Sequence, residues 1–275
     1  MPGICALCRR LGELCESHAI PKAFIRPILR ANGGSVILVP TGPGKIHRGG
    51  DVLKGKLLCA TCEEKTNKDI DAPAIRFLSD LKRQVDAGGA RKGSFPSKDL
   101  AIFAISVLWR AVLIKGYTSV RLDKAMRETF RVNILDRGQS PLQHCSIRIG
   151  RLIDRTPVGG FDTKSLANFI FPPSGHVSAT GQQVVTMAMH GLIFELGFPR
   201  QRAASFRIPG YLKDASATIM LPDFDIFASP PIVDAMVTGY GKDMSGHSTL
   251  GRAERTQRQN VVGKFPSEVS DGNDI

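Results

Sequence analysis

Two pairs of cysteines are the residues of this 275-residue chain whose types and spacing most clearly predict chemistry. Each pair has the form Cys-x2-Cys, in which a tight turn lets both sulfur atoms reach the same metal ion. A second pair, tens of residues later, can complete a tetrahedral site and join two distant segments. We therefore predict a structural Zn²⁺ site, rather than ordinary buried thiols, with these ligands: Cys5, Cys8, Cys59 and Cys62.

A histidine between the two pairs, His18, adds a candidate catalytic residue. It follows the first pair and begins a His-Ala-Ile-Pro sequence that ends at Pro21. An imidazole can accept a proton from water near neutral pH, so His18 is a candidate general base. Cys15 and His18 also have the spacing of a metal-binding turn, and on that reading His18 would be a zinc ligand instead.

The stretch Glu16-Ser17-His18-Ala19-Ile20-Pro21, together with Leu57-Leu58-Cys59-Ala60-Thr61-Cys62, resembles the HNH, or ββα-metal, endonucleases. The likeness covers roughly residues 4 to 71. It extends to an uncharacterised bacterial branch with Ser-His-x-Ile-Pro and Cys-x2-Cys-Glu sequences. The resemblance implies a zinc-bound treble clef, in which a histidine at the end of the first hairpin strand is the general base. In this sequence that histidine is His18.

The sequence departs from this family beside the base histidine. Family members usually have Asp, Glu or His there as a ligand of the catalytic ion, whereas this chain has Ser17, a poor ligand. Glu63 and Asn67 follow the second cysteine pair at i and i+4, so they share a helix face and could point towards His18. Their carboxylate and amide oxygens suit a catalytic Mg²⁺ or Mn²⁺. On the alternative reading, both are simply exposed polar residues in the first turns of a helix.

The formal net charge of +12 is concentrated in the first part of the chain. Residues 1–160 contain 27 Lys and Arg against 14 Asp and Glu, while residues 161–275 contain 10 against 11. A basic surface binds nucleic acid through release of counterions, so we expect nucleic acid as the partner. The resemblance to HNH endonucleases implies DNA in preference to RNA. The candidate phosphate contacts lie on a predicted helix and in a Gly-rich loop: Lys22, Arg26, Arg30, Lys45, His47 and Arg48.

Composition also bears on the compartment. Six cysteines, four of them in zinc spacing, favour a reducing environment over a disulfide scaffold. The first residues lack the pattern of a signal peptide. The longest apolar run, Leu100 to Leu113, is too short to span a bilayer. We therefore expect a cytoplasmic protein with no membrane partner.

The expected fold class is α+β, with an N-terminal zinc-bound treble clef, a helical middle and a β-rich C-terminal part. We expect an HNH-like zinc module over residues 1–71. An α+β domain should follow over residues 72–237, helical over 73–135 and β-rich over 145–221. Residues 238–275 are rich in Gly, Ser and charge, and are predicted to be a disordered tail.

Apolar periodicity predicts the helices of the middle part. A helix that begins at about Cys62 should stop before Pro73, and an amphipathic helix should follow over residues 74–85. Ser97 is expected to cap a buried central helix that ends near residue 114. A further helix is expected over residues 121–135.

The β-rich part shows shorter patterns. Strands are expected at residues 145–149 and 166–171, and one or two more within residues 184–198. Pro172-Pro173-Ser174-Gly175 is expected to be a turn. The ordered pattern is expected to end at Ser229-Pro230-Pro231.

Three functions follow from these patterns. The first is a metal-dependent HNH-type endonuclease that hydrolyses phosphodiester bonds in DNA. The second is a non-catalytic zinc-binding protein that binds nucleic acid, which Ser17 favours and the retained His-x-Ile-Pro sequence opposes. The third, a protein-interaction scaffold, is opposed by the basic charge of residues 1–160. The residues of the β-rich part identify no ligand.

Overall fold

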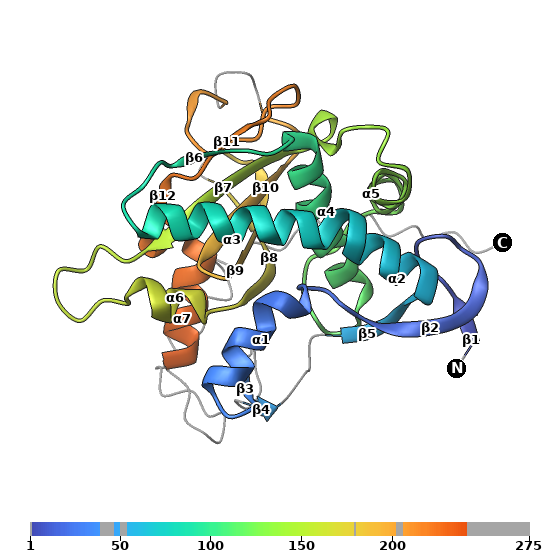
Figure 1. The fold of residues 1–275 in the computed structure, drawn as a ribbon, viewed down its shortest axis with the longest axis horizontal. Coiled ribbons are helices and arrows are strands. Elements are labelled where there is room, and N and C mark those ends of the chain that lie inside the picture. Colours follow the sequence, from blue (N-terminus) through green and yellow to red (C-terminus); the bar gives the residue numbers. More distant parts are fainter. Residues whose placement is uncertain (1, 39–46, 50–53, 179, 202–205, 241–275) are drawn as a thin grey trace.

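The computed structural model describes residues 2–38, 47–49, 54–178, 180–201 and 206–240. It is a mixed structure of helices and sheets (Figure 1). A three-stranded sheet lies at the N-terminal end, helices fill the middle, and a five-stranded sheet forms the C-terminal part. The expected combination of α and β elements is confirmed.

The N-terminal sheet pairs strands that are far apart in the sequence. Its order is β1-β2-β5, with these bounds: β1 (Pro2–Ile4), β2 (Leu11–His18) and β5 (Lys54–Cys59). β2 and β5 are antiparallel, from Leu14 opposite Cys59 to His18 opposite Lys54. The strand β5 leads directly into α2 (Ala60–Thr66). The two ends of residues 19–53 are therefore held side by side.

In its described residues, the segment between β2 and β5 contains a helix and two short antiparallel strands. These are α1 (Lys22–Ala31), β3 (Val36–Leu38) and β4 (His47–Gly49). In α1 the buried residues are Phe24, Ile25 and Ile28, which fall on one side of a 3.6-residue period. The opposite side of α1 therefore faces solvent.

A single long helix crosses the molecule from the N-terminal sheet. α2 continues through a π-helical turn, Asn67–Asp71, into α3 (Ala72–Asp86), and Figure 1 shows them as one rod. The prediction of a stop before Pro73 is wrong. Proline lacks an N–H and clashes with the carbonyl four residues earlier. Here Ala72 N–H bonds to Asn67 O, an i to i+5 bond. We attribute the tolerance of Pro73 inside the helix to this wider turn.

The amphipathic pattern predicted over residues 74–85 is confirmed within α3. Its inward positions Ala74, Leu78, Leu81 and Val85 are buried. The predicted boundary between residues 71 and 72 falls inside the continuous helix. Residues of the N-terminal sheet and of the middle helices also share one apolar core.

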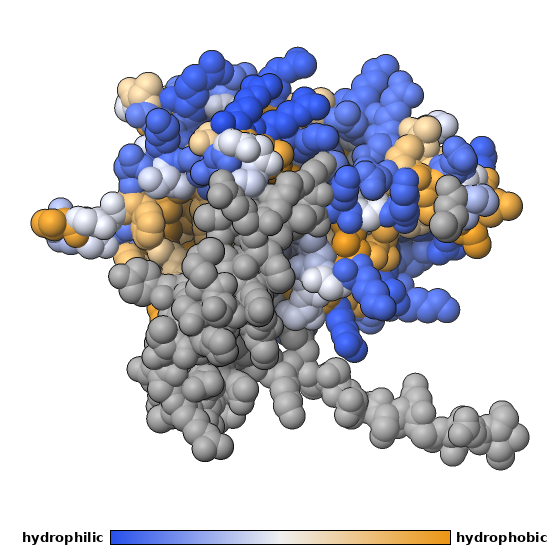
Figure 2. All heavy atoms as spheres, turned by 90° about the horizontal axis from the view of Figure 1, so that it is seen from below, coloured by the Kyte–Doolittle hydropathy of each residue, from blue (hydrophilic) through white to orange (hydrophobic). Residues whose placement is uncertain are grey.

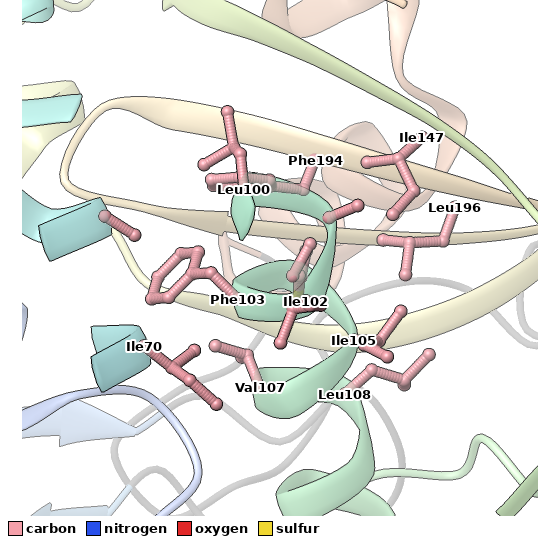
Figure 3. Close-up of a cluster of buried hydrophobic side chains, with 14 of the residues drawn as sticks. Ile70, Leu100, Ile102, Phe103, Ile105, Val107, Leu108, Ile147, Phe194 and Leu196 are labelled. Atoms are coloured by element: carbon pink, nitrogen blue, oxygen red, sulfur yellow. The ribbon is translucent and has the colours of Figure 1, made fainter. Parts of the chain in front are cut away.

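The centre of that core is α4 (Ser97–Leu113), in which every residue from Leu100 to Ala111 is buried. A helix that is apolar all round must be enclosed on all sides. Figure 3 shows Phe194 and Leu196 beside one side of α4 and Ile70, from the π-helical turn, beside another. The predicted central helix is confirmed, but its cap is not. Ser97 is its first residue, and the cap position belongs to Pro96, which has no side-chain donor or acceptor.

The helix α5 (Lys124–Asp136) packs beside α4 and confirms the helix predicted at 121–135. Asp123 caps it by accepting from Met126 N–H at 2.7 Å. Trp109 of α4 donates its indole N–H to the carbonyl of Arg127 at 3.1 Å, which joins the two helices.

The five-stranded sheet has the order β12-β7-β10-β9-β8. Its strands are β7 (Ser146–Ile153), β8 (Phe171–Val177), β9 (Gln183–Met189), β10 (Leu192–Phe198) and β12 (Asp223–Asp225). One face packs on α4, and a separate apolar cluster on the other face includes residues of α6 (Thr163–Ala167) and α7 (Pro230–Tyr240). The remaining short elements are β6 (Lys92–Ser94), paired with β11 (Thr218–Met220), and 3₁₀ turns at Pro141–Gln143 and Ile226–Ala228.

Three predictions for the C-terminal part are wrong, one because of a short helix and two because of proline. Residues 166–171 are not a strand, because α6 ends at Ala167 and β8 begins only at Phe171. The predicted turn at 172–175 lies inside β8. This is an edge strand with a register shift between Phe171 and Ser174, and such positions tolerate proline. The ordered structure continues past Pro230, which is the first residue of α7. Proline is favourable at the first position of a helix.

The other predictions for the C-terminal part concern its strands and its tail. The pattern at 184–198 is confirmed as two strands, and the strand predicted at 145–149 is confirmed as the first part of β7. The predicted tail begins at 238, yet α7 runs to Tyr240. Residues 241–275 lie outside the described residues.

No helix among the described residues is long and apolar enough to cross a membrane. The side of the molecule drawn in Figure 2 is mainly hydrophilic where it is described, with hydrophobic atoms gathered at its two ends. These ends are the β1–β2 hairpin and the loop between β7 and α6. The exposed apolar residues there are Ile4, Leu11, Val158 and Phe161.

Candidate metal centre

Four cysteine thiols meet where the N-terminal sheet joins α2. Cys5 and Cys8 lie in the turn between β1 and β2, while Cys59 ends β5 and Cys62 lies in the first turn of α2. All four Sγ atoms lie within 4.8 Å of one another. The Sγ atoms of Cys8 and Cys59 are 3.9 Å apart. Tetrahedral Zn–S bonds of about 2.3 Å would place sulfur atoms about 3.8 Å apart. The four thiols are therefore close enough to bind one metal ion.

Backbone hydrogen bonds hold the first cysteine turn in this shape. Cys5 N–H bonds to Arg10 O at 2.9 Å, and Arg9 N–H bonds to Cys5 O at 2.8 Å. Arg9 has a φ of 62°, the left-handed conformation that closes the turn. The second pair is joined to the first because Cys59 N–H donates to Cys5 Sγ at 3.3 Å.

The thiols differ in how readily they lose a proton. Burial raises the pKa of Cys5, but hydrogen bonds from the backbone of Cys8, Cys59 and Leu7 outweigh it and lower the pKa to about 7. Burial and the neighbouring sulfur atoms raise the pKa of Cys62 far above its usual range. Four thiolates in one place repel one another, and a bound cation removes that penalty. The donor set therefore fits a thiophilic metal ion.

A helix from the middle of the chain holds the first cysteine turn in place. Arg131 of α5 donates from Nη1 to the carbonyl of Leu7 at 2.6 Å and from Nη2 to Glu128 at 2.8 Å. Glu128 also pairs with Arg9. The bond from Arg131 lowers the pKa of the Glu128 carboxyl. Glu128 and, less strongly, the Cys8 sulfur raise the pKa of Arg131. Sequence reasoning missed this contact, because 124 residues separate Leu7 from Arg131.

The structure places the candidate catalytic residues beside the cysteines without gathering them into a second metal cluster. Among the described residues, the group of Cys, His, Asp and Glu side chains close enough to hold an ion consists of the four cysteines, without Cys15 or His18. His18 is the last residue of β2 and is half-buried. Asn67 is exposed at the start of the π-helical turn.

The residue before His18 makes a contact that the sequence did not reveal. Ser17 is completely buried, and its Oγ donates to Oε2 of Glu63 at 2.6 Å. Glu63 is half-buried in α2, one residue after Cys62. The end of β2 and the first turns of α2 are thus joined by side chains next to the cysteine cluster. A serine and a glutamate 46 positions apart give no pattern in a single sequence.

The candidate phosphate contacts are partly described. Lys22, Arg26 and Arg30 are exposed and lie along one side of α1, four residues apart. The expected positions in the Gly-rich loop give less information. Lys45 lies outside the described residues, and the side chains of His47 and Arg48, which belong to β4, lie outside them too.

Family models, curated proteins and solved structures give no match to this chain. Three features of the described structure bear on its function: the four thiols, the Ser17–Glu63 contact and the exposed cations of α1.

Proposed function

We propose that this chain is a metal-dependent endonuclease of the HNH type that hydrolyses phosphodiester bonds in DNA. In this proposal the four cysteines bind a structural Zn²⁺, and β2, β5 and α2 are the two strands and the helix of a ββα-metal treble clef. The order of these elements, with one cysteine pair before β2 and the other at the start of α2, supports the proposal.

The observation that carries the proposal is the hydrogen bond between Ser17 and Glu63. It fixes the end of β2, where His18 lies, to the helix that carries Glu63 and Asn67. A nuclease needs its general base and its metal-binding carboxylate within reach of one phosphate group. The contact brings the backbone of these two elements together at a buried point.

Each residue then has a role. His18 accepts the proton of the attacking water as general base. Glu63 and the Asn67 side chain, one turn further along, would hold a Mg²⁺ or Mn²⁺ ion through a carboxylate and a neutral amide oxygen. Such an ion, when bound, stabilises the charge that develops on the phosphate and on the leaving oxygen. Ser17 replaces the acidic ligand expected at its position and orients Glu63 instead.

The exposed cations of α1 support DNA as the substrate. α1 begins four residues after His18, and its side chains Lys22, Arg26 and Arg30 face solvent. Cations at i, i+4 and i+8 follow one side of a helix and can contact successive phosphates. The substrate backbone would thus be held next to the proposed base.

A non-catalytic zinc module that binds nucleic acid is the second candidate, and one observation favours it. One oxygen of the Glu63 carboxylate already accepts a hydrogen bond from Ser17, and Ser17 itself has no carboxylate. Ser17 and Glu63 together therefore offer a divalent ion at most one carboxylate. Mg²⁺ tolerates this, because it usually keeps several waters and binds proteins through one or two carboxylates. Activity separates the two candidates.

The deciding experiment measures nuclease activity on plasmid DNA and on single-stranded RNA, with Mg²⁺ or Mn²⁺ added to protein of known zinc content. The variants are His18→Ala and, as the matched control, His144→Ala, which removes an exposed histidine far along the chain. We expect wild type and the control to cut DNA, and His18→Ala to lose about two to four orders of magnitude in rate while one zinc per chain remains.

Other results would change the assignment. Loss of zinc in His18→Ala would make His18 a structural ligand. If the wild type cuts neither nucleic acid with either ion but still binds DNA in a salt-sensitive way, the non-catalytic candidate is correct.

A further inference from the structure

The five-stranded sheet has one face that is apolar at one end and polar at the other. Strand pairing aligns Glu195 of β10 with Arg148 of β7 and with Thr186 of β9. It also aligns His176 of β8 with Val184 of β9, which pairs in turn with Gly197. Residues directly opposite in neighbouring strands share a face, so these side chains all lie on the face that is turned away from α4. Ile193, further along β10 on this face, belongs to the second apolar cluster, with α6 and α7.

The polar end of this face is hollow. A cavity of about 130 Å³ is bounded there by residues of β8, β9 and β10, by Ser178 just after β8, and by two residues that follow β10. Five of the residues that line it have side chains able to form hydrogen bonds: His176, Ser178, Glu195, Gln201 and Tyr211. Gly197, which has no side chain, forms part of the wall.

One polar atom of the cavity wall lacks a partner within the described part of the chain: Nδ1 of His176 is buried without a hydrogen bond there. Oγ1 of Thr186, which lies opposite Glu195 in the sheet, is also buried without one. Glu195 forms an ion pair with Arg148, in which the contact from Nη1 is long, at 3.5 Å. An unsatisfied buried polar group costs free energy, so such groups together indicate a missing partner. Burial also raises the pKa of Glu195 and lowers that of His176.

We propose that this cavity is a binding site for a small amino-substituted nitrogen heterocycle. Such a ring presents an amino group beside a ring nitrogen, the edge that adenine and cytosine share. The amino group donates to Glu195, and the ring nitrogen beside it faces the remaining polar groups of the wall. Nothing in the proposed nuclease reaction uses these residues. The site is therefore independent of the metal centre.

Size and chemistry select this class of ligand. An engineered cavity of roughly 150 Å³ binds one benzene ring, so about 130 Å³ accommodates a single six-membered ring. The Glu195 carboxyl, whose contact with Arg148 is long, can accept a further hydrogen bond. An amino group can donate that bond, and the ring nitrogen beside it is an acceptor. Glu195 also borders a second hollow, of about 330 Å³, lined in part by Arg148 and Arg155, which gives a ring substituent room to extend.

The test is isothermal titration calorimetry of the full chain with 2-aminopyridine and cytosine, and with pyridine as a ring that lacks the amino group. We expect both amino ligands to bind, and pyridine to bind at least about tenfold more weakly. Glu195→Gln, which keeps the shape of the side chain, should weaken the amino ligands by about tenfold or more. Asp214→Asn, the same change at an exposed position, should leave binding unchanged.

Three results would overturn the proposal: no binding of either amino ligand to wild type, equal binding of pyridine, or unchanged affinity in Glu195→Gln. Circular dichroism checks that each variant is folded. If Glu195→Gln is not folded, Tyr211→Phe decides instead, because it removes one wall hydroxyl, and unchanged affinity there would equally refute the site. Binding is read without nuclease activity, so the outcome does not depend on the function proposed above.

Discussion

Arg131 is the residue through which the middle of the chain reaches the cysteine cluster. Its guanidinium bonds to the carbonyl of Leu7 inside the first cysteine turn, at 2.6 Å, and lies near enough to Cys8 for the sulfur to raise its pKa. Groups that orient metal ligands from outside the coordination sphere typically change metal affinity by 10- to 100-fold. The cation also offsets the negative charge of four thiolates.

We therefore expect Arg131→Leu to weaken binding of the proposed zinc ion by at least about tenfold. Competition with a chromophoric chelator measures the affinity. Arg127→Leu is the matched control, because this exposed arginine lies one turn earlier on the same helix. Equal affinities in the two variants would show that Arg131 serves only the packing of α5.

His190 makes the packing of α1 sensitive to pH. It lies in the turn between β9 and β10, and its ring stacks on Phe24 with centroids 5.2 Å apart. Burial, and then the charge of Lys82, lower the pKa of His190 below its ordinary value near 6.5. A lowered pKa means that the unfolded chain takes up the proton more readily. The stabilisation is present above about pH 6.5 and is lost as the pH falls through the lower, folded-state pKa.

The expected result is a fall in melting temperature between pH 7.5 and 5.5 that becomes smaller in His190→Asn. Asparagine suits the left-handed backbone at this position, where φ is 56°. His144→Asn, at an exposed site, should keep the wild-type dependence. His176, whose pKa burial also lowers, contributes in the same direction and remains in both variants. A pH dependence that His190→Asn leaves untouched would contradict the assignment.

At the scale of elements, the joint between α2 and α3 depends on a buried ion pair. Asp71, the last residue of the π-helical turn, accepts two hydrogen bonds from Arg110 of α4, at 2.8 and 2.9 Å. The side chains are only 6% and 3% exposed. Removing one partner of such a pair leaves a buried charge uncompensated, whereas replacing both by apolar groups is often nearly neutral.

Arg110→Met alone should lower the free energy of unfolding by about 3–5 kcal/mol. The double variant Arg110→Met with Asp71→Leu should recover a large part of that loss. Urea unfolding of the four proteins in this double-mutant cycle gives the coupling energy. If the losses in the two single variants simply add in the double variant, the pair does not act as a unit.

The elements that the sequence predicted correctly are those that packing alone defines. The apolar pattern of α3 and α4 and the run over residues 184–198 give helices and strands, because burial and periodicity point to the same answer. The failures depend on context. Pro73 continues a helix only because a π-helical turn precedes it, and Pro172 and Pro173 belong to a strand only because β8 lies at the edge of the sheet.

The candidate sites divide in the same way. Local spacing identified the four cysteines, since each pair needs only its own turn to present two sulfur atoms. The Ser17–Glu63 bond and the polar cavity beside Glu195 require strands and helices to meet first. A single sequence carries no record of which distant side chains will face each other.

At the scale of the whole molecule, the metal centre and the central helix share one core. Cys5 and Cys62 belong to the same apolar cluster as Phe103 of α4 and Phe194 of β10. Loss of the proposed zinc ion should therefore destabilise the described core as a whole, beyond the cysteine turns alone. Zinc present at about 1,000 times its dissociation constant stabilises a folded protein by about 4 kcal/mol.

Chelation should lower the melting temperature in one cooperative transition, and added Zn²⁺ should restore it. Calorimetry with and without a chelator measures the shift, and Cys62→Ser, which removes one ligand, should no longer respond. A separate low-temperature transition that leaves the main transition in place would show that the cysteine module unfolds independently.

The pairing of β2 with β5 has a consequence for how this molecule could evolve. The 35 residues from 19 to 53 leave and return at two neighbouring strands that lie about 5 Å apart. Closing such a loop costs only slightly more when it grows longer. New sequence could therefore enter between these strands without displacing either one, while the cysteines and the Ser17–Glu63 bond stay in place. α1, with its exposed cations, lies on this replaceable segment, so related proteins could change the charge of this surface while they keep the same cysteine cluster.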